Sequence, residues 1–233
     1  MNDLALELRG VKAGYGPITV LRGVDLAVPY GSLVALLGPN GGGKSTTLRV
    51  IAGQLPVTGG EVIVAGRKVN GSAPDELARR GVCLIPEGRG IFPNLSVREN
   101  LSMATHTGTS LQAIEEIAYA RFTHLGPRRR QLAGTLSGGE QQMLAMARAL
   151  ATNPALLLLD ELSMGLAPIV VEQLYEIVAQ VAKEGVSIVV VEQFARAILG
   201  IADWVGIMLR GRISTFGTPA TVEAELSTAY LGD

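Results

Sequence analysis

A glycine-rich segment that ends in Lys44 and Ser45 is the first place where residue types and spacing could do chemistry. A glycine and four variable residues precede Gly-Lys-Ser, in the order Gly38-Pro39-Asn40-Gly41-Gly42-Gly43-Lys44-Ser45. In a loop of this kind, backbone N–H groups converge on phosphates, the lysine reaches the outer phosphates and the hydroxyl coordinates Mg²⁺. The spacing therefore predicts a site for the phosphate chain of a nucleotide, to which Thr46 also belongs.

The residues around this segment distinguish two interpretations of it. A glycine-rich turn with a solvated lysine would have the same letters. Here the short apolar run 33–37 precedes the segment, and residues 44–52, closed by Gly53, have the pattern of a helix. A loop between a buried strand and a helix is the context that phosphate binding needs, so the pattern favours the nucleotide site.

Two adjacent carboxylates, Asp160 and Glu161, form the second chemical group. They follow the apolar run 155–159, and ligands of α/β sheets bind at the carboxyl ends of strands. We expect Asp160 to hold Mg²⁺ together with Ser45, and Glu161 to be the general base that orients water toward the γ-phosphate. Acidic residues that merely cap the next element are the alternative, which suits one carboxylate better than a pair.

The elements that must position these groups alternate along the chain. Apolar runs at 33–37, 155–159 and 187–191, bounded by Gly, Asp or Glu, predict strands buried on both faces of a parallel sheet. A helix with one apolar face is expected after Pro168. This alternation predicts an α/β fold with a parallel sheet.

Two regions are expected to differ from that core. Short segments with turn glycines before residue 33 and at 62–69 predict a small antiparallel sheet. Between residues 97 and 151 no strand run occurs, and a helix is expected to reach Pro127 because apolar residues recur at helical spacing, namely Leu111, Ile114, Ala118, Phe122 and Leu125.

We therefore expect one domain over residues 1–233. Its catalytic core and β subdomain would occupy about 1–88 and 153–233, and an inserted helical subdomain about 89–152. A hairpin over 204–216 that turns at Gly211, followed by a short helix, would complete it.

Composition excludes several classes of protein. The 20 basic and 21 acidic residues give a net charge of −1, so no nucleic-acid partner is expected. A single cysteine, Cys83, excludes an internal disulfide, indicates a reducing compartment and is expected to pack as a small apolar residue. No apolar run approaches the roughly 20 residues of a transmembrane helix.

A third group opens a helix and reads Leu136-Ser137-Gly138-Gly139-Glu140-Gln141-Gln142. Ser137 and Glu140 have the spacing of a capping box. Two glycines at the first helical positions lower helix propensity, which is easier to understand if a ligand approaches the bare backbone. A well-capped helix without a ligand is the alternative.

Taken together, these groups resemble the ATP-binding-cassette (ABC) ATPases, whose signature is LSGGQ or LSGGE, along essentially the whole chain. The resemblance implies a P-loop NTPase (RecA-like) fold with a small antiparallel β subdomain and an inserted helical subdomain. It also implies ATP hydrolysis with ATP and Mg²⁺, and two cassettes docked head to tail. It implies that Tyr15 stacks on adenine, although an ordinary strand aromatic is the alternative. In such a dimer the signature residues would meet ATP held by the partner cassette, namely Leu136, Ser137, Gly138, Gly139 and Glu140.

Finer matches resemble the LivF-type subunits of branched-chain amino-acid importers. The resemblance implies a second, non-identical ABC ATPase subunit, polytopic permease subunits and, indirectly, a periplasmic or extracellular solute-binding protein. It implies a peripheral position on the cytoplasmic face of the membrane and import of branched-chain or related amino acids or amides. Rival interpretations are a soluble ABC ATPase with a non-transport partner and a regulatory cassette without hydrolysis. The matching segments are 86–89 with Phe92, 99–101, 133–135, 165–168, 192–193 and 230–232.

Departures from the family pattern surround the site. Glu87 and Gln193 stand where most ABC ATPases have glutamine and histidine. Gln193 is expected to position the γ-phosphate, and Glu87 to face Mg²⁺ with its charge offset by the metal or by Arg89. Leu162 replaces the usual proline, which frees the backbone of 163–167, and Gly42 replaces the usual alanine.

Three other features have plainer interpretations. The pair Phe92-Pro93 either packs under the helical subdomain or forms a transmission surface toward the permease. The run Arg128-Arg129-Arg130 is expected to be an exposed charge cluster, with lipid headgroup contact as the alternative. His106 and His124 lack metal-ligand spacing and are expected to be solvated.

Overall fold

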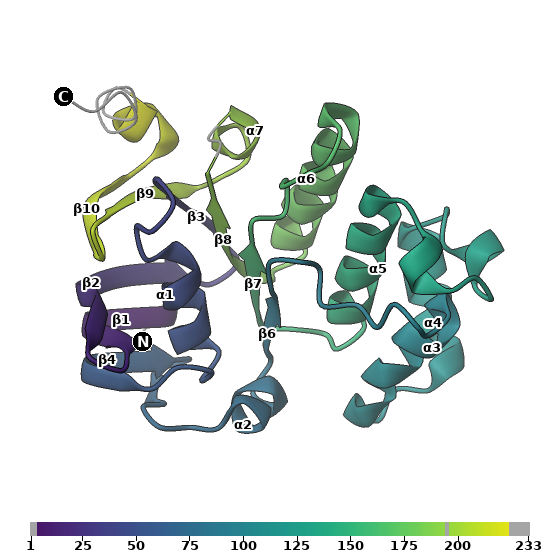
Figure 1. Cartoon of the computed structure of the whole chain (residues 1–233), viewed down its shortest axis with the longest axis horizontal. Coiled ribbons are helices and arrows are strands. Elements are labelled where there is room, and N and C mark those ends of the chain that lie inside the picture. Colours follow the sequence, from purple (N-terminus) through teal and green to yellow (C-terminus); the bar gives the residue numbers. More distant parts are fainter. Residues whose placement is uncertain (1–3, 194–195, 224–233) are drawn as a thin grey trace.

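A six-stranded sheet forms the core of the computed structural model, which describes residues 4–193 and 196–223 (Figure 1). Its strand order is β10-β9-β3-β8-β7-β6, and only the pair of β9 with β10 is antiparallel. The strands are β3 (Leu33–Leu37), β6 (Val82–Ile85), β7 (Leu156–Asp160), β8 (Ser187–Glu192), β9 (Trp204–Leu209) and β10 (Arg212–Gly217). Every residue of β3, β7 and β8 is buried, as their continuous apolar runs predict.

A second, antiparallel sheet of four strands lies beside one face of this core. Its order is β2-β1-β4-β5, with β1 (Leu4–Tyr15), β2 (Ile18–Pro29), β4 (Val57–Val64) and β5 (Arg67–Lys68). Apolar side chains of β1 and β2 join those of β3, β8 and helix α1 (Lys44–Ile51) in one cluster. The parallel sheet and the small antiparallel sheet confirm the predicted α/β class.

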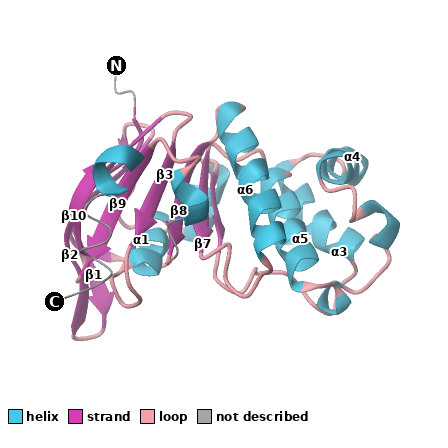
Figure 2. Ribbon diagram, turned by 90° about the horizontal axis from the view of Figure 1, so that it is seen from above, coloured by secondary structure: helices cyan, strands magenta, loops and turns pink. Residues whose placement is uncertain are grey.

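Two long helices cover the opposite face of the core sheet. Helix α6 (Pro168–Lys183) buries Leu174, Val178 and Val181 in the cluster that contains the other face of β3 and β8. Helix α5 (Gly138–Leu150) packs in the same cluster, next to α6 in both ribbon views (Figure 2). The short helices α2 (Pro74–Arg79) and α7 (Arg196–Leu199) follow β5 and β8.

Helices without strands occupy the chain between β6 and β7. These are α3 (Val97–Ser102), α4 (Leu111–Arg121), α5 and three 3-10 turns, Met103–Thr107, Gly126–Arg128 and Ala133–Thr135. The prediction that one helix reaches Pro127 is wrong, because α4 ends at Arg121. Phe122 and Leu125 are nevertheless buried, since the chain folds back after α4 and directs both into the core.

The end of the chain forms the predicted hairpin of β9 and β10, and the C-terminal helix predicted after it lies mostly outside the described residues. Within residues 4–193 and 196–223, no helix combines the length and the apolar character that crossing a membrane requires.

Candidate functional site

The glycine-rich segment 38–43 links β3 to α1, and its glycines are required by geometry. Gly38, Gly41 and Gly43 have φ of 149°, 78° and 104°, which side-chain-bearing residues rarely adopt. A Cβ at Gly38 would lie 2.2 Å from the Met208 carbonyl oxygen. At Gly42, where the family usually has alanine, a Cβ would lie 2.8 Å from the same oxygen, so this loop is packed more closely on β9 than an alanine would allow without a shift.

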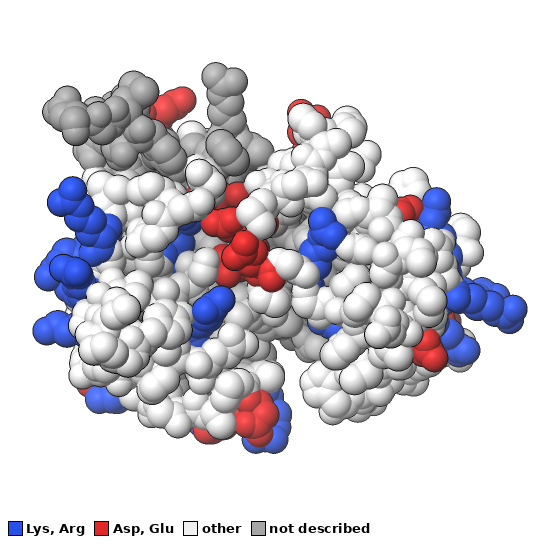
Figure 3. Space-filling view, viewed as in Figure 1, with Lys and Arg blue, Asp and Glu red and all other residues white. Residues whose placement is uncertain are grey.

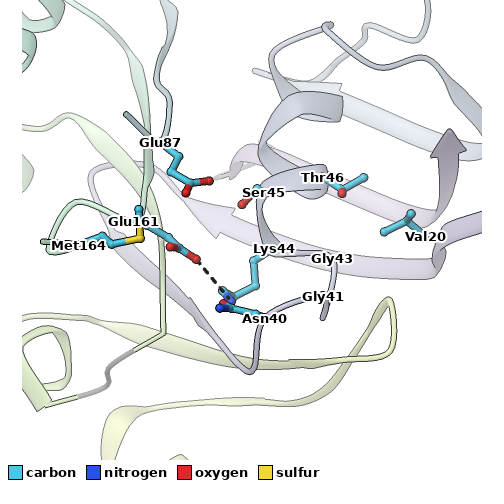
Figure 4. A pocket seen from close by; sticks show the side chains of 10 residues that line it. All are labelled: Val20, Asn40, Gly41, Gly43, Lys44, Ser45, Thr46, Glu87, Glu161 and Met164. Carbon is cyan, nitrogen blue, oxygen red and sulfur yellow. Dashed lines mark ion pairs between the residues drawn. The ribbon is translucent and has the colours of Figure 1, made fainter. Parts of the chain in front are cut away.

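A cavity of about 430 Å³ opens beside this loop, within the size range of small-molecule sites. Figure 4 shows Lys44 directed toward Glu161, while Glu87 lies across from Ser45. The cavity therefore combines one cation with carboxylates from two other strand ends. Its lining consists of Val20, Asn40, Gly41, Gly43, Lys44, Ser45, Thr46, Glu87, Glu161 and Met164.

Lys44 is turned inward onto its own loop. Its side chain is 3% exposed, and Nζ donates to the carbonyl oxygens of Gly38 at 2.9 Å and Pro39 at 3.2 Å. Nζ also lies 4.0 Å from Oε1 of Glu161. Burial lowers the pKa of Lys44, and attraction to Glu161 and Asp160 opposes that shift. A buried ammonium with carbonyl partners can exchange them for phosphate oxygens.

Asp160 and Ser45 meet behind the cavity. The Ser45 hydroxyl donates to Oδ1 of Asp160 at 2.8 Å, and Asp160 is 4% exposed. Burial raises the pKa of Asp160, the bond from Ser45 lowers it and the charge of Glu87 raises it. Hydroxyl and carboxylate oxygens are the donors that Mg²⁺ prefers, so this pair fits a magnesium ion completed by phosphates and water. The described residues contain no group of three or more His, Cys, Asp or Glu that could hold a metal alone.

Glu161 has a strained backbone at the edge of the cavity. Its φ is 48°, in the left-handed region, and its N–H donates to the Val191 carbonyl at 3.0 Å. Burial raises the pKa of Glu161, while Lys44 lowers it and the nearby carboxylates raise it. In the space-filling view, acidic side chains gather in the middle of this face, between the strands and the helical part (Figure 3).

A buried carboxylate whose contacts the sequence does not predict lies next to this loop. Glu192 is 2% exposed and accepts hydrogen bonds from Ser163 and Tyr175. Leu162 is buried and Ser163 is held by Glu192, so the first residue of the segment 163–167 is bound, while the expectation that Leu162 frees the rest of that backbone stays a prediction. The signal in the sequence is a glutamate that continues the apolar run of β8 without a break.

The loop that carries Glu87 is tied to α5. Arg89 donates to the side chain of Gln141, and Arg148 donates to the Gly90 carbonyl at 2.5 Å. Arg89 forms no ion pair with Glu87 in the part of the chain that the structure describes, and the offset of the Glu87 charge by the metal or by Arg89 stays a prediction. Phe92 is 45% exposed and lies 5.2 Å from the Arg148 guanidinium, on the surface and not under the helices.

The signature segment starts α5 with the predicted capping box. Ser137 accepts from the N–H of Glu140, and Glu140 accepts from the N–H of Ser137 at 2.9 Å. Arg128 pairs with Glu140 at 3.0 Å, so one residue of the arginine run is not simply solvated. A Cβ on Gly139 would lie 2.6 Å from Val170, so packing on α6 alone requires that glycine. None of the five signature residues, 136–140, lines the phosphate-loop cavity.

The remaining predicted residues lie around the rim. Tyr15 is 42% exposed, and its hydroxyl accepts from Arg49 at 3.1 Å. Gln193 lines a second cavity of about 460 Å³, which shares Glu161 with the first. Burial raises the pKa of the Cys83 thiol, and both histidines are exposed.

Comparisons with known proteins agree with this geometry. The model of the ABC transporter family matches residues 21–163. The chain is 40% identical over 231 residues to the high-affinity branched-chain amino acid transport ATP-binding protein BraG of Pseudomonas aeruginosa, covering 97% of this chain and 99% of that protein. It is 36% identical over 216 residues to the probable branched-chain amino acid transport ATP-binding protein LivF of Archaeoglobus fulgidus, covering 91% and 92%. The crystal structure of a nucleotide-free ATP-binding cassette from an ABC transporter superposes with a TM-score of 0.85 at 25% identity, covering 99% and 100%.

Proposed function

Because the chain belongs to the ABC transporter family of ATP-binding proteins, we propose that it is the ATP-hydrolysing subunit of an importer for branched-chain amino acids or related amino acids and amides. The convergence of Lys44, Ser45 and Glu161 on one cavity, in a chain 40% identical to BraG, carries this proposal. The names of BraG and LivF favour a transporter over a soluble ATPase with another kind of partner. The presence of Lys44, Asp160 and Glu161 argues against a cassette that binds ATP without hydrolysing it.

The chain's own residues perform the steps of hydrolysis. Lys44 leaves the carbonyls of its loop and pairs with the outer phosphates, because a charged acceptor forms the stronger hydrogen bond. Glu161 accepts the proton of the water that attacks the γ-phosphate, and its raised pKa makes it a better base than an exposed glutamate. Gln193 orients the γ-phosphate through its amide.

Ser45 and Asp160 would hold Mg²⁺, with Glu87 facing it from the opposite side of the cavity. When bound, Mg²⁺ supplies neutralisation of phosphate charge. Tyr15 would have to leave Arg49 or slide past it to stack on adenine, since its hydroxyl is held there.

Assembly with other subunits is part of the proposal. Residues 136–140 do not line the chain's own cavity and are exposed or half-buried at Ser137 and Gly138, which supports their use on nucleotide held by a partner cassette. We place the helical subdomain at about 89–152 and the core with the β subdomain at about 1–88 and 153–233. The partner is a second, non-identical cassette, and both lie on permease subunits at the cytoplasmic face, served indirectly by a solute-binding protein.

The test is purification of the tagged chain from its native cell, followed by identification of copurifying proteins. A polytopic membrane protein and a second cassette are expected. Recovery of only soluble partners would refute the importer. Mass measurements with and without Mg-ATP test the partner: the isolated chain should dimerise weakly, and a stable homodimer with full hydrolysis would contradict a non-identical partner.

A further inference from the structure

The carboxylate of Glu192 is buried and plays no part in the mechanism above. Glu192 is the last residue of β8, is 2% exposed and forms no ion pair with any residue that the structure describes. A charged group removed from water is tolerated only where hydrogen bonds replace its hydration. The position of those hydrogen bonds shows what the carboxylate holds.

Three donors from two other elements meet this carboxylate. Oε1 accepts from the N–H of Ser163 at 3.0 Å and from the Tyr175 hydroxyl at 2.5 Å. Oε2 accepts from the Ser163 hydroxyl at 2.8 Å. An ionised carboxylate only accepts hydrogen bonds, and the Ser163 N–H and the two hydroxyls can all donate to it in charge-assisted bonds, which are the strong ones. Glu192 therefore fastens the segment after β7 and helix α6 to the end of β8, and β7, β8 and α6 lie next to one another in Figure 1.

The fastened segment contains the strained residue of the site. Glu161 has its unusual φ of 48°, and its N–H is bound by Val191, the residue before Glu192. Two residues later, Ser163 is bound by Glu192 itself. The end of β8 thus holds the segment on both sides of Leu162. A strained conformation such as that of Glu161 persists only where its surroundings hold it. Gln193, which is proposed to orient the γ-phosphate, directly follows Glu192 in the chain.

We propose that Glu192 is a positioning residue for hydrolysis, which holds Ser163 and thereby fixes the backbone of Glu161 relative to Gln193. The inference rests on the proposed function, in which Glu161 is the base. Glu192 does not line the phosphate-loop cavity, but it lines the second cavity together with Glu161, Ser163 and Gln193, so it acts on the geometry of the reacting groups.

The test uses the full chain in the complex with which it copurifies. Glu192→Gln keeps the shape but removes the negative charge, so the charge-assisted bonds become weaker neutral ones, and Ser163→Ala removes one of the three bonds. We expect kcat of Glu192→Gln to fall by about 10- to 100-fold, because misplacement of a reacting group by about 1 Å has effects of that size. The KM for ATP should change by less than about threefold, since the residues that bind ATP equally in the ground state and in the transition state are unchanged.

Matched variants separate positioning from mere stability. Glu176→Gln makes the same chemical change on the exposed side of α6 and should behave as wild type. The double variant of Glu192→Gln and Ser163→Ala should be no slower than Glu192→Gln, since both disrupt one contact. Should Glu192→Gln fail to fold, Tyr175→Phe and Ser163→Ala carry the test, each expected to lower kcat with an unchanged KM.

A lowered Tm with wild-type kcat in Glu192→Gln would overturn the proposal. The same result in both Tyr175→Phe and Ser163→Ala would also overturn it. Glu161→Gln is assayed in parallel to separate the two levels of inference. If Glu161→Gln still turns over, the proposed base is wrong; if only Glu161→Gln is inactive, the base is right and the positioning role of Glu192 is refuted.

Discussion

Replacement of the proposed base by its amide, Glu161→Gln, should separate nucleotide binding from chemistry. The amide has the shape of the carboxylate but cannot accept a proton. Loss of general-base catalysis lowers rates by about 10²- to 10⁴-fold, equivalent to about 3–5 kcal/mol in the barrier. The backbone should keep its conformation, because the N–H of Glu161 remains bound to Val191.

Nucleotide affinity should stay equal or rise in the same variant. Glu161 lies 4.0 Å from Lys44, with side chains 12% and 3% exposed. ATP must compete with this ion pair, whose net worth after desolvation is on the order of 1 kcal/mol. The Glu161→Gln substitution also removes one negative charge from the site, where Glu87 and Asp160 are the other carboxylates that would repel the phosphates. Affinity should therefore rise by at most about tenfold.

The assay is single-turnover phosphate release beside a binding titration with a fluorescent ATP analogue, on the same preparation. Glu176→Gln, an identical substitution on the exposed face of α6, is the control. Turnover within about tenfold of wild type would refute Glu161 as the base, because the expected loss is at least about 10²-fold. Markedly weaker binding would refute the ion-pair reasoning.

Three further predictions concern other residues of the proposed site. Lys44→Ala should weaken nucleotide binding by about 10- to 100-fold in the same titration, because a charge-assisted hydrogen bond of about 1.5–3 kcal/mol is lost. In steady-state assays of the assembled complex, Gln193→Ala should slow hydrolysis, whereas Gln193→His and Glu87→Gln should largely preserve it; wild-type turnover in Gln193→Ala would make that residue a bystander. Burial raises the pKa of Asp160 in the folded chain above its ordinary 3.8. The protonated carboxyl therefore favours folding at low pH, and this contribution to the free energy of unfolding is lost as pH rises through the raised pKa. Asp160→Asn should accordingly raise the Tm of the nucleotide-free chain at neutral pH, with a gain that shrinks toward acidic pH in a thermal-shift series, and an unchanged Tm at neutral pH would contradict this cause.

The central strands were predictable because each is a run of apolar residues buried on both faces. The expected strands 33–37, 155–159 and 187–191 agree with β3, β7 and β8 to within one residue at either end. Helix α4 was predicted too long, because a buried apolar residue gives the same signal in a helix and in the turn after it. Phe122 and Leu125 are such residues.

The grouping of the site residues was predictable from the rule that loops gather at the carboxyl ends of parallel strands. The partners of individual side chains were not. Which donor satisfies Glu192, or that Arg89 reaches Gln141, depends on how α5 and α6 lie across the sheet. Sequence spacing also cannot distinguish a glycine required by a ligand from one required by packing, as at Gly139.

The packing of β9 on the phosphate loop has a consequence for synthesis of the chain. Gly211, in the turn of the last hairpin, donates to the Gly42 carbonyl at 2.9 Å and accepts from the N–H of Arg22 at 2.9 Å, and a Cβ there would lie 1.8 Å from the Val20 carbonyl oxygen. The loop is therefore completed by residues made about 170 positions later, roughly 10–30 s at about 5–20 residues per second. A nascent chain on the ribosome should therefore complete its nucleotide-binding loop only after this hairpin emerges.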